Sequence, residues 1–138
     1  MNRVVHFEIQ AADPERAAKF YGEIFGWEIK EWVVPGVKIK DENRYWLVAT
    51  APEKSKEPGI NGGILFRQGP ASEEGQSVNA YVCTIGVVSV DEYLEKITKA
   101  GGLVAFPKMP IMGMGWLAYL KDLDGNIFGI MQEDKNAK

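Results

Sequence analysis

The segment that decides the fold is VVHFEIQAADPERAAKFYGEIFGW, residues 4–27. In its first part, Val5, Phe7 and Ile9 alternate with polar side chains, which is the period-two pattern of a strand with one buried face. Asp13 and Pro14 follow, and they suit the N-cap and the first turn of a helix. Apolar residues then recur at helical spacing up to a glycine stop: Ala17, Phe20, Tyr21, Ile24, Phe25 and Gly26. The segment predicts a strand followed by an amphipathic helix.

The same order returns in YVCTIGVVSVDEYLEKITKAGG, residues 81–102. Val5 corresponds to Tyr81, an offset of 76 residues. Ser89 and Glu92 form a capping box at the start of the second helix, and a glycine pair ends it. Strand, cap and helix stop agree at one offset, so the sequence predicts a structural duplication.

Extended segments follow each predicted helix. They are 27–33, 45–49 and 63–66 in the first half and 103–106, 116–120 and 127–131 in the second. Residues 122–126, Asp-Leu-Asp-Gly-Asn, have the composition of a hairpin turn. Each half is therefore predicted to be βαβββ, with module one at about residues 1–67 and module two at about 78–133. The polar stretch 68–77 is interpreted as the linker, and residues 134–138 as a solvated tail.

Composition limits the classes of protein that are possible. The chain has 138 residues, 46% of them hydrophobic, and a net charge of −3, which favours a single globular domain. It shows no basic excess, so a nucleic-acid partner is not expected. It also lacks an apolar run of about 20 residues, so a membrane span is not expected. The single cysteine, Cys83, suits a reducing compartment, and we predict a cytoplasmic protein.

Together these motifs resemble the vicinal oxygen chelate superfamily, which includes glyoxalase I, extradiol dioxygenases and the bleomycin- and fosfomycin-resistance proteins. The resemblance rests on residues 6–9, 13–21, 25–27, 89–91, 100–102 and 121–129. It implies an α+β fold in a single domain, residues 1–138. In this fold two βαβββ modules form a cupped, eight-stranded half-barrel sheet with the helices outside. It also implies a small-molecule ligand in the cup and a homodimer.

Metal-dependent members of this superfamily hold an ion with four side chains on the cup-facing strands. The resemblance places these positions at His6, near Ile64 or Leu65, at Val82 and at Gly129. Only His6 has a ligand atom, and Glu8 would add at most a second one, whereas a divalent ion needs about three protein ligands or more. The ending of the chain resembles a metal-less branch of the superfamily. We therefore predict no metal and no cofactor.

His6 is the single histidine of the chain, and it shares a predicted strand face with Glu8. The pair would hydrogen-bond a ligand, or His6 would act as a general base oriented by Glu8. The alternative is a buried histidine satisfied by a neighbour. The other candidate ligand-binding residues are Trp46, Arg67, Val82, Trp116, Gly129 and Met131. For the tryptophans the alternative is a place in the core, and for Arg67 it is a solvated strand end.

The leading hypothesis is a metal-independent protein that binds a small, partly apolar organic molecule in the cup. An enzyme is the alternative, a glyoxalase-type lyase or isomerase that uses His6 and Glu8 for proton transfer. A third possibility is a purely structural homodimer subunit.

Overall fold

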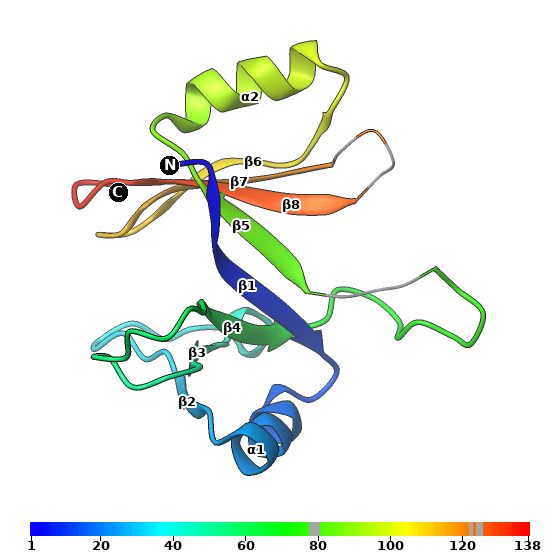
Figure 1. Cartoon of the computed structure of the whole chain (residues 1–138), viewed down its shortest axis with the longest axis vertical. Helices are drawn as coiled ribbons and strands as arrows, with labels where there is room; N and C mark the ends of the chain where they lie inside the picture. The colour runs from blue at the N-terminus through cyan, green and yellow to red at the C-terminus, as the bar shows by residue number, and fades with distance from the viewer. Residues whose placement is uncertain (78–80, 122, 124–125) are drawn as a thin grey trace. The chain divides into compact units, whose positions relative to one another are not determined.

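The computed structural model describes residues 1–77, 81–121, 123 and 126–138, and they form two compact units (Figure 1). The N-terminal unit is His6–Tyr81, and the C-terminal unit combines Met1–Val5 with Val82–Lys138. Strand β1, Arg3–Ala11, is therefore divided between them. Its first three residues belong to the C-terminal unit and the others to the N-terminal unit.

The N-terminal unit has the βαβββ order that the sequence predicts. After β1 come α1 (Pro14–Phe25), β2 (Glu28–Glu31), the short 3-10 helix η1 (Asp41–Asn43), β3 (Tyr45–Ala49) and β4 (Asn61–Phe66). The strands lie in the order β2-β3-β4-β1; β1 and β4 are parallel and the other pairs antiparallel. Helix α1 begins where the Asp13 carboxylate accepts the Arg16 N–H at 3.0 Å, and it ends at Gly26 with φ 71°.

The C-terminal unit repeats this order. It contains β5 (Val82–Gly86), α2 (Val90–Lys99), β6 (Leu103–Ile111), β7 (Gly115–Lys121) and β8 (Ile127–Glu133). Its strand order is β5-β8-β7-β6, again with the first strand parallel to the last and antiparallel pairs elsewhere. The Ser89 hydroxyl accepts the Glu92 N–H at 3.2 Å and caps α2.

Through β1, the hydrogen-bonded order of the eight strands is β2-β3-β4-β1-β5-β8-β7-β6. The predicted α+β fold with two βαβββ modules is thus confirmed. The shared cup stays a prediction, and so do the module boundaries. In the part of the chain that is described, neither helix is long and apolar enough to cross a membrane.

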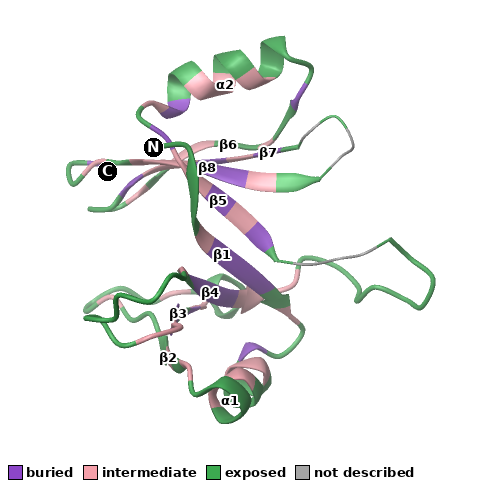
Figure 2. Cartoon of the chain, viewed as in Figure 1, coloured by how far each residue is buried: buried purple, intermediate pink, exposed green. Residues whose placement is uncertain are grey.

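Most of the buried residues of each unit lie on its strands (Figure 2). In the N-terminal unit, the core contains the hydrophobic side chains of Phe7, Ile9, Trp46, Val48 and Ile64, each with at most 8% exposure. The Phe7 ring stacks on Tyr81 and contacts Trp27, and Trp27 in turn stacks on Tyr21 of α1. The aromatic residues of this first half therefore tie α1 to β1.

The core of the C-terminal unit is aliphatic. It contains Val87, Val90, Ala118, Leu120 and Ile130, each with at most 1% exposure. Residues of α2, β7 and β8 pack around this core, including Tyr93, Leu94, Ile97, Trp116 and Phe128. The periodicity of the second half therefore predicts the buried face of α2 correctly.

Two details differ from the sequence-based expectations. Strand β6 runs on to Ile111 and contains Pro107 and Pro110, which an edge strand with register shifts can hold. The expected tail is not fully solvated, because Ala137 is 1% exposed and its carbonyl accepts the Gly113 N–H at 3.1 Å. Residues 122, 124 and 125 of the expected hairpin turn lie outside the described residues.

Candidate functional site

A polar cluster lies on the face of the N-terminal sheet that α1 does not cover. It consists of His6 and Glu8 from β1 and Tyr45 from the start of β3. His6 Nε2 lies 2.8 Å from the Tyr45 hydroxyl oxygen. Strand alternation explains the placement, because Phe7 and Ile9 point to the α1 side and the residues between them point away. We call these three residues the His6–Tyr45 cluster.

Gly63 creates the space for this cluster. It pairs with Glu8 across β1 and β4 and with Leu47 across β3 and β4. A Cβ at position 63 would overlap the Tyr45 hydroxyl and ring. A glycine at this position therefore lets the Tyr45 side chain cross β4 and reach His6.

Burial controls the charge of the cluster. Removal from water lowers the pKa of His6 below its ordinary value, and the nearby Glu8 carboxylate opposes part of this effect. The Glu8 side chain is itself buried, with 7% exposure. At neutral pH the imidazole is therefore uncharged, and one ring nitrogen can accept a proton or a hydrogen bond.

The C-terminal unit has an equivalent place, on the face that α2 does not cover. Thr84 of β5 pairs with Gly129 of β8, and Gly129 pairs with Tyr119 of β7. A Cβ on Gly129 would lie 2.6 Å from the Thr84 hydroxyl oxygen. Val82 and Met131 share this face by alternation. The sequence-based assignment of Gly129 and Met131 to one face agrees with this register.

The remaining predicted site residues lie elsewhere. Trp46 is opposite Ile64 on the α1 side, with 5% exposure. Trp116 packs on the α2 side, and its indole N–H donates to the Asp134 carboxylate at 3.0 Å. Arg67, just after β4, donates to the Gln10 carbonyl at 3.3 Å. Both tryptophans thus lie on helix-covered faces. The face that each one occupies depends on the strand register, which the sequence alone does not show.

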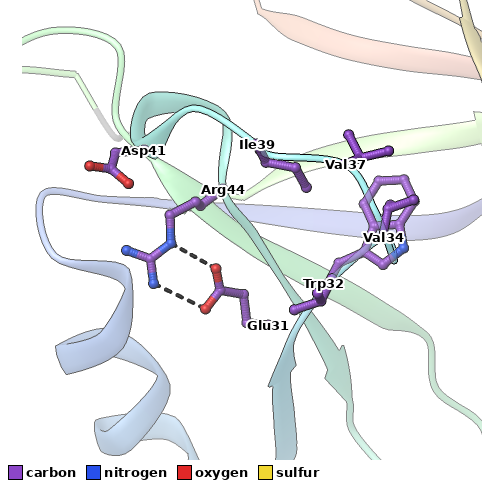
Figure 3. A pocket seen from close by; sticks show the side chains of 8 residues that line it. Glu31, Trp32, Val34, Val37, Ile39, Asp41 and Arg44 are labelled. Atoms are coloured by element: carbon purple, nitrogen blue, oxygen red, sulfur yellow. Dashed lines mark hydrogen bonds and ion pairs between the residues drawn. The ribbon is translucent and has the colours of Figure 1, made fainter.

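A separate hollow of about 280 Å³ lies at the sheet edge, in the connection from β2 to β3 (Figure 3). Its polar wall consists of Glu31, Asp41 and Arg44, and its apolar wall is formed by Trp32, Val33, Val34, Val37 and Ile39. We call it the loop hollow. Sequence reasoning missed it, and it also missed Tyr45 and Gly63. The glycine pair 62–63 beside an aromatic strand was the available signal for the last two.

Comparison with known proteins adds to this picture. A family model described as bleomycin resistance protein-like N-terminal matches residues 3–35. A Mycobacterium bovis protein named "Putative glyoxylase CFP32" is 27% identical over 134 residues, covering 94% of this chain and 45% of that protein. The chain thus spans about half the length of the curated relatives it matches.

Solved structures share the whole fold. A methylmalonyl-CoA epimerase in complex with methylmalonyl-CoA and NH4+ matches with a TM-score of 0.64 and 17% identity, covering 100% of this chain and 99% of the other. The hypothetical protein BH1468 of Bacillus halodurans matches with a TM-score of 0.64 and 16% identity, covering 99% and 97%. The family-model match and the mycobacterial relatives support the resemblance to the vicinal oxygen chelate superfamily, and the solved structures show that the chain shares a known fold.

The residues of this chain do not fit the ion that metal-dependent members of the superfamily hold. Glu8 and Thr84 are equivalent in the duplication, so their partners Gly63 and Gly129 are equivalent too. The position expected near Ile64 or Leu65 is therefore Gly63, and both carboxylate positions are glycine. Within the described residues, no three His, Cys, Asp or Glu side chains gather closely enough to hold a metal ion.

Proposed function

We propose that the chain is a metal-independent binding protein for a small organic molecule. The observation that carries the proposal is the His6–Tyr45 cluster on the uncovered face of the N-terminal sheet. Where a metal-dependent relative would place a carboxylate, Gly63 instead makes room for the Tyr45 hydroxyl. The His6 imidazole and the Tyr45 hydroxyl therefore present neutral hydrogen-bonding groups to a ligand.

The surroundings of the cluster define the chemistry of its ligand. Leu47 and Leu65 lie on the same face by strand register, and Leu47 is 46% exposed. An apolar surface beside one polar pair fits a partly apolar molecule with a single hydroxyl, carbonyl or carboxyl group. In the C-terminal unit, Val82, Gly129 and Met131 remain proposed ligand-binding residues. Trp46 and Trp116 are left out because their helix-covered faces keep them from this ligand.

A ligand screen tests the proposal. Thermal shift over small aromatic and dicarbonyl metabolites identifies a ligand, since binding raises the apparent stability, and calorimetry then measures its affinity. Loss of one ligand hydrogen bond should weaken binding about tenfold in His6→Gln and Tyr45→Phe. Lys19→Gln, at a highly exposed side chain, is the control. Equal affinity in all four proteins would remove the cluster from the binding site.

Metal independence is tested separately. Extensive chelation should leave both the melting temperature and the ligand affinity unchanged. Addition of nickel, zinc or manganese should not raise the melting temperature. A metal-induced rise that His6→Gln abolishes would overturn this part of the proposal while leaving ligand binding intact.

A glyoxalase-type lyase or isomerase is the second candidate. Its support is the neutral imidazole of His6, which can accept a proton, together with the glyoxylase name of the mycobacterial relatives. The structures titled methylmalonyl-CoA epimerase add CoA esters to the substrates worth testing. Turnover of a hemithioacetal or of a CoA ester, lost in His6→Gln, would establish the enzyme. Binding without turnover would leave the first proposal standing.

We also propose a cytoplasmic homodimer without a nucleic-acid partner. A single cysteine suits a reducing compartment, and a net charge of −3 does not suit a polyanion. The mass of the purified protein in solution tests the dimer, because a monomer mass over the working concentration range would contradict it.

A further inference from the structure

The connection from β2 to β3 is a loop whose residues line the loop hollow. At its base, Trp32 N–H donates to the Tyr45 carbonyl at 2.7 Å, which continues the β2–β3 pairing. Within the loop, Val37 N–H donates to the Val34 carbonyl at 3.1 Å and forms a tight turn. The loop hollow of about 280 Å³ is lined by residues of this turn and of both ends of the connection. This volume is close to the lower end of the range of about 300–1,000 Å³ that small-molecule pockets span.

Ion pairs fix the polar wall of the loop hollow. Arg44 donates to both carboxylate oxygens of Glu31, at 2.7 and 3.0 Å (Figure 3). It also donates to Glu15 of α1 at 3.0 Å. The hydrogen bond from Arg44 lowers the pKa of Glu31, and the two glutamates raise the pKa of Arg44. Glu31 and Arg44 therefore both stay charged, and their ion pair is neutral overall.

Asp41 adds a negative charge to the same wall. It is an exposed residue at the start of η1, and its side chain lies beyond Arg44 in Figure 3. The two lysines of the loop, Lys38 and Lys40, are exposed and do not line the hollow. The wall as a whole is therefore negative.

The opposite wall is apolar and open to solvent. Figure 3 shows Trp32 close to Val34 and Val37, on the other side of the hollow from Asp41. Trp32 is 37% exposed, Val33 71% and Val37 57%. Such a group of exposed apolar side chains beside a cavity favours contact with a ligand. The indole face of Trp32 is also the best aromatic partner for an organic cation.

We propose that the loop hollow binds a small organic cation with an apolar body, such as an arylalkyl ammonium. The cationic group lies against Asp41 and the Glu31 side, and the carbon body packs on Trp32, Val34 and Val37. This binding site is separate from the His6–Tyr45 cluster and does not depend on the function proposed for it.

Calorimetry and NMR with benzyltrimethylammonium as the probe test the proposal on the full chain. We expect the cation to bind at least about tenfold more tightly than phenylacetate, which has a similar ring and the opposite charge. Its largest shift should fall on the Trp32 indole N–H. Trp32→Ala should weaken binding about tenfold and Asp41→Asn several-fold. Circular dichroism checks that each variant is folded.

Two variants serve as matched controls. Glu42→Gln removes an acid next to Asp41 that does not line the hollow, and it should bind as the wild type does. His6→Gln should also bind normally, so a failure of the His6–Tyr45 proposal is distinguishable from a failure of this one. Tighter binding of phenylacetate would make Arg44 the anchor and overturn the proposal. Wild-type affinity in both Trp32→Ala and Asp41→Asn would overturn it too.

Discussion

His6 is a useful reporter because it is the only histidine in the chain. Its imidazole is hydrogen-bonded to Tyr45 and lies beside the buried Glu8. Any signal from an imidazole ring therefore reports on the His6–Tyr45 cluster alone. This makes the cluster accessible to experiment before any ligand is known.

The lowered pKa of His6 predicts a pH dependence of stability. In the unfolded chain the imidazole takes up a proton as the pH falls through about 6.5, whereas the folded protein resists protonation until a lower pH. The free energy of unfolding should therefore fall as the pH drops below about 6.5. Each tenfold difference in proton affinity between the two states is worth about 1.4 kcal/mol.

Urea unfolding at several pH values, compared between the wild type and His6→Gln, measures this effect. The variant controls for the carboxylates, which titrate in both proteins. NMR titration of the one imidazole measures the folded pKa directly, and a value at or above that of an unfolded peptide would refute the prediction.

Gly63→Ala should destabilise the N-terminal unit. The added Cβ displaces the Tyr45 ring, so the His6 hydrogen bond is lost and water reaches the imidazole. We expect a loss of about 1–3 kcal/mol, typical of overpacking, and a rise in the pKa of His6. Gly59→Ala is the control, because a Cβ there meets no atom within 4 Å. Equal stability of the two variants would show that Tyr45 does not depend on Gly63.

At the scale of the elements, the sequence predicted the ends of the helices well, whereas it did not show how the strands pair. Asp13 and Ser89 cap the two helices as expected, and Gly26 ends the first in a left-handed conformation. These signals act over about four residues of chain and are visible in any sequence. The periodicity of β1 likewise predicted that Phe7 and Ile9 lie on the buried face.

The sequence did not show which face of the sheet Trp46 and Trp116 occupy. Each lies on a strand whose neighbours are also apolar, so alternation within the strand does not show which side the helix covers. Only pairing with Ile64 and with Gln132 decides it. The same holds for Tyr45, whose role depends on a glycine in another strand. A site whose residues come from several strands therefore cannot be predicted from the pattern within each strand alone.

Ser89→Ala should cost about 1 kcal/mol of stability, because it removes the acceptor for the Glu92 N–H at the start of α2. Lys99→Gln is the comparison, since its ion pair with Glu95 is exposed and should contribute under about 0.5 kcal/mol. Urea unfolding of the two variants checks the ranking, and a larger loss in Lys99→Gln would reverse it.

At the scale of the whole molecule, the chain order and the structural units do not coincide. Residues 1–5 belong with the second half of the sequence. Asn2 holds them there, because its backbone N–H donates to the Gly86 carbonyl at 2.8 Å and its side-chain amide to the Tyr93 hydroxyl at 2.7 Å. Its φ of 62° is one that asparagine tolerates better than most residues do.

Asn2→Ala should therefore weaken the C-terminal unit selectively, by about 1–2 kcal/mol. Hydrogen exchange should become faster at the amides of β5 and α2 and stay unchanged in β3 and β4. Asn43→Ala, at an exposed residue of η1, is the matched control. Uniformly faster exchange across both units would mean that they open as one.

The grouping of residues 1–5 with Val82–Lys138 also has a mechanical consequence. Residues 1–5 and 82–138 belong to one unit, and the other unit, His6–Tyr81, is inserted between them in the sequence. A force applied to residues 1 and 138 acts first on the hydrogen bonds of Asn2 to Gly86 and Tyr93. The inserted unit bears no force until those hydrogen bonds break. Stretching a single molecule should therefore unfold the C-terminal unit first and the N-terminal unit second, in two separate extension steps.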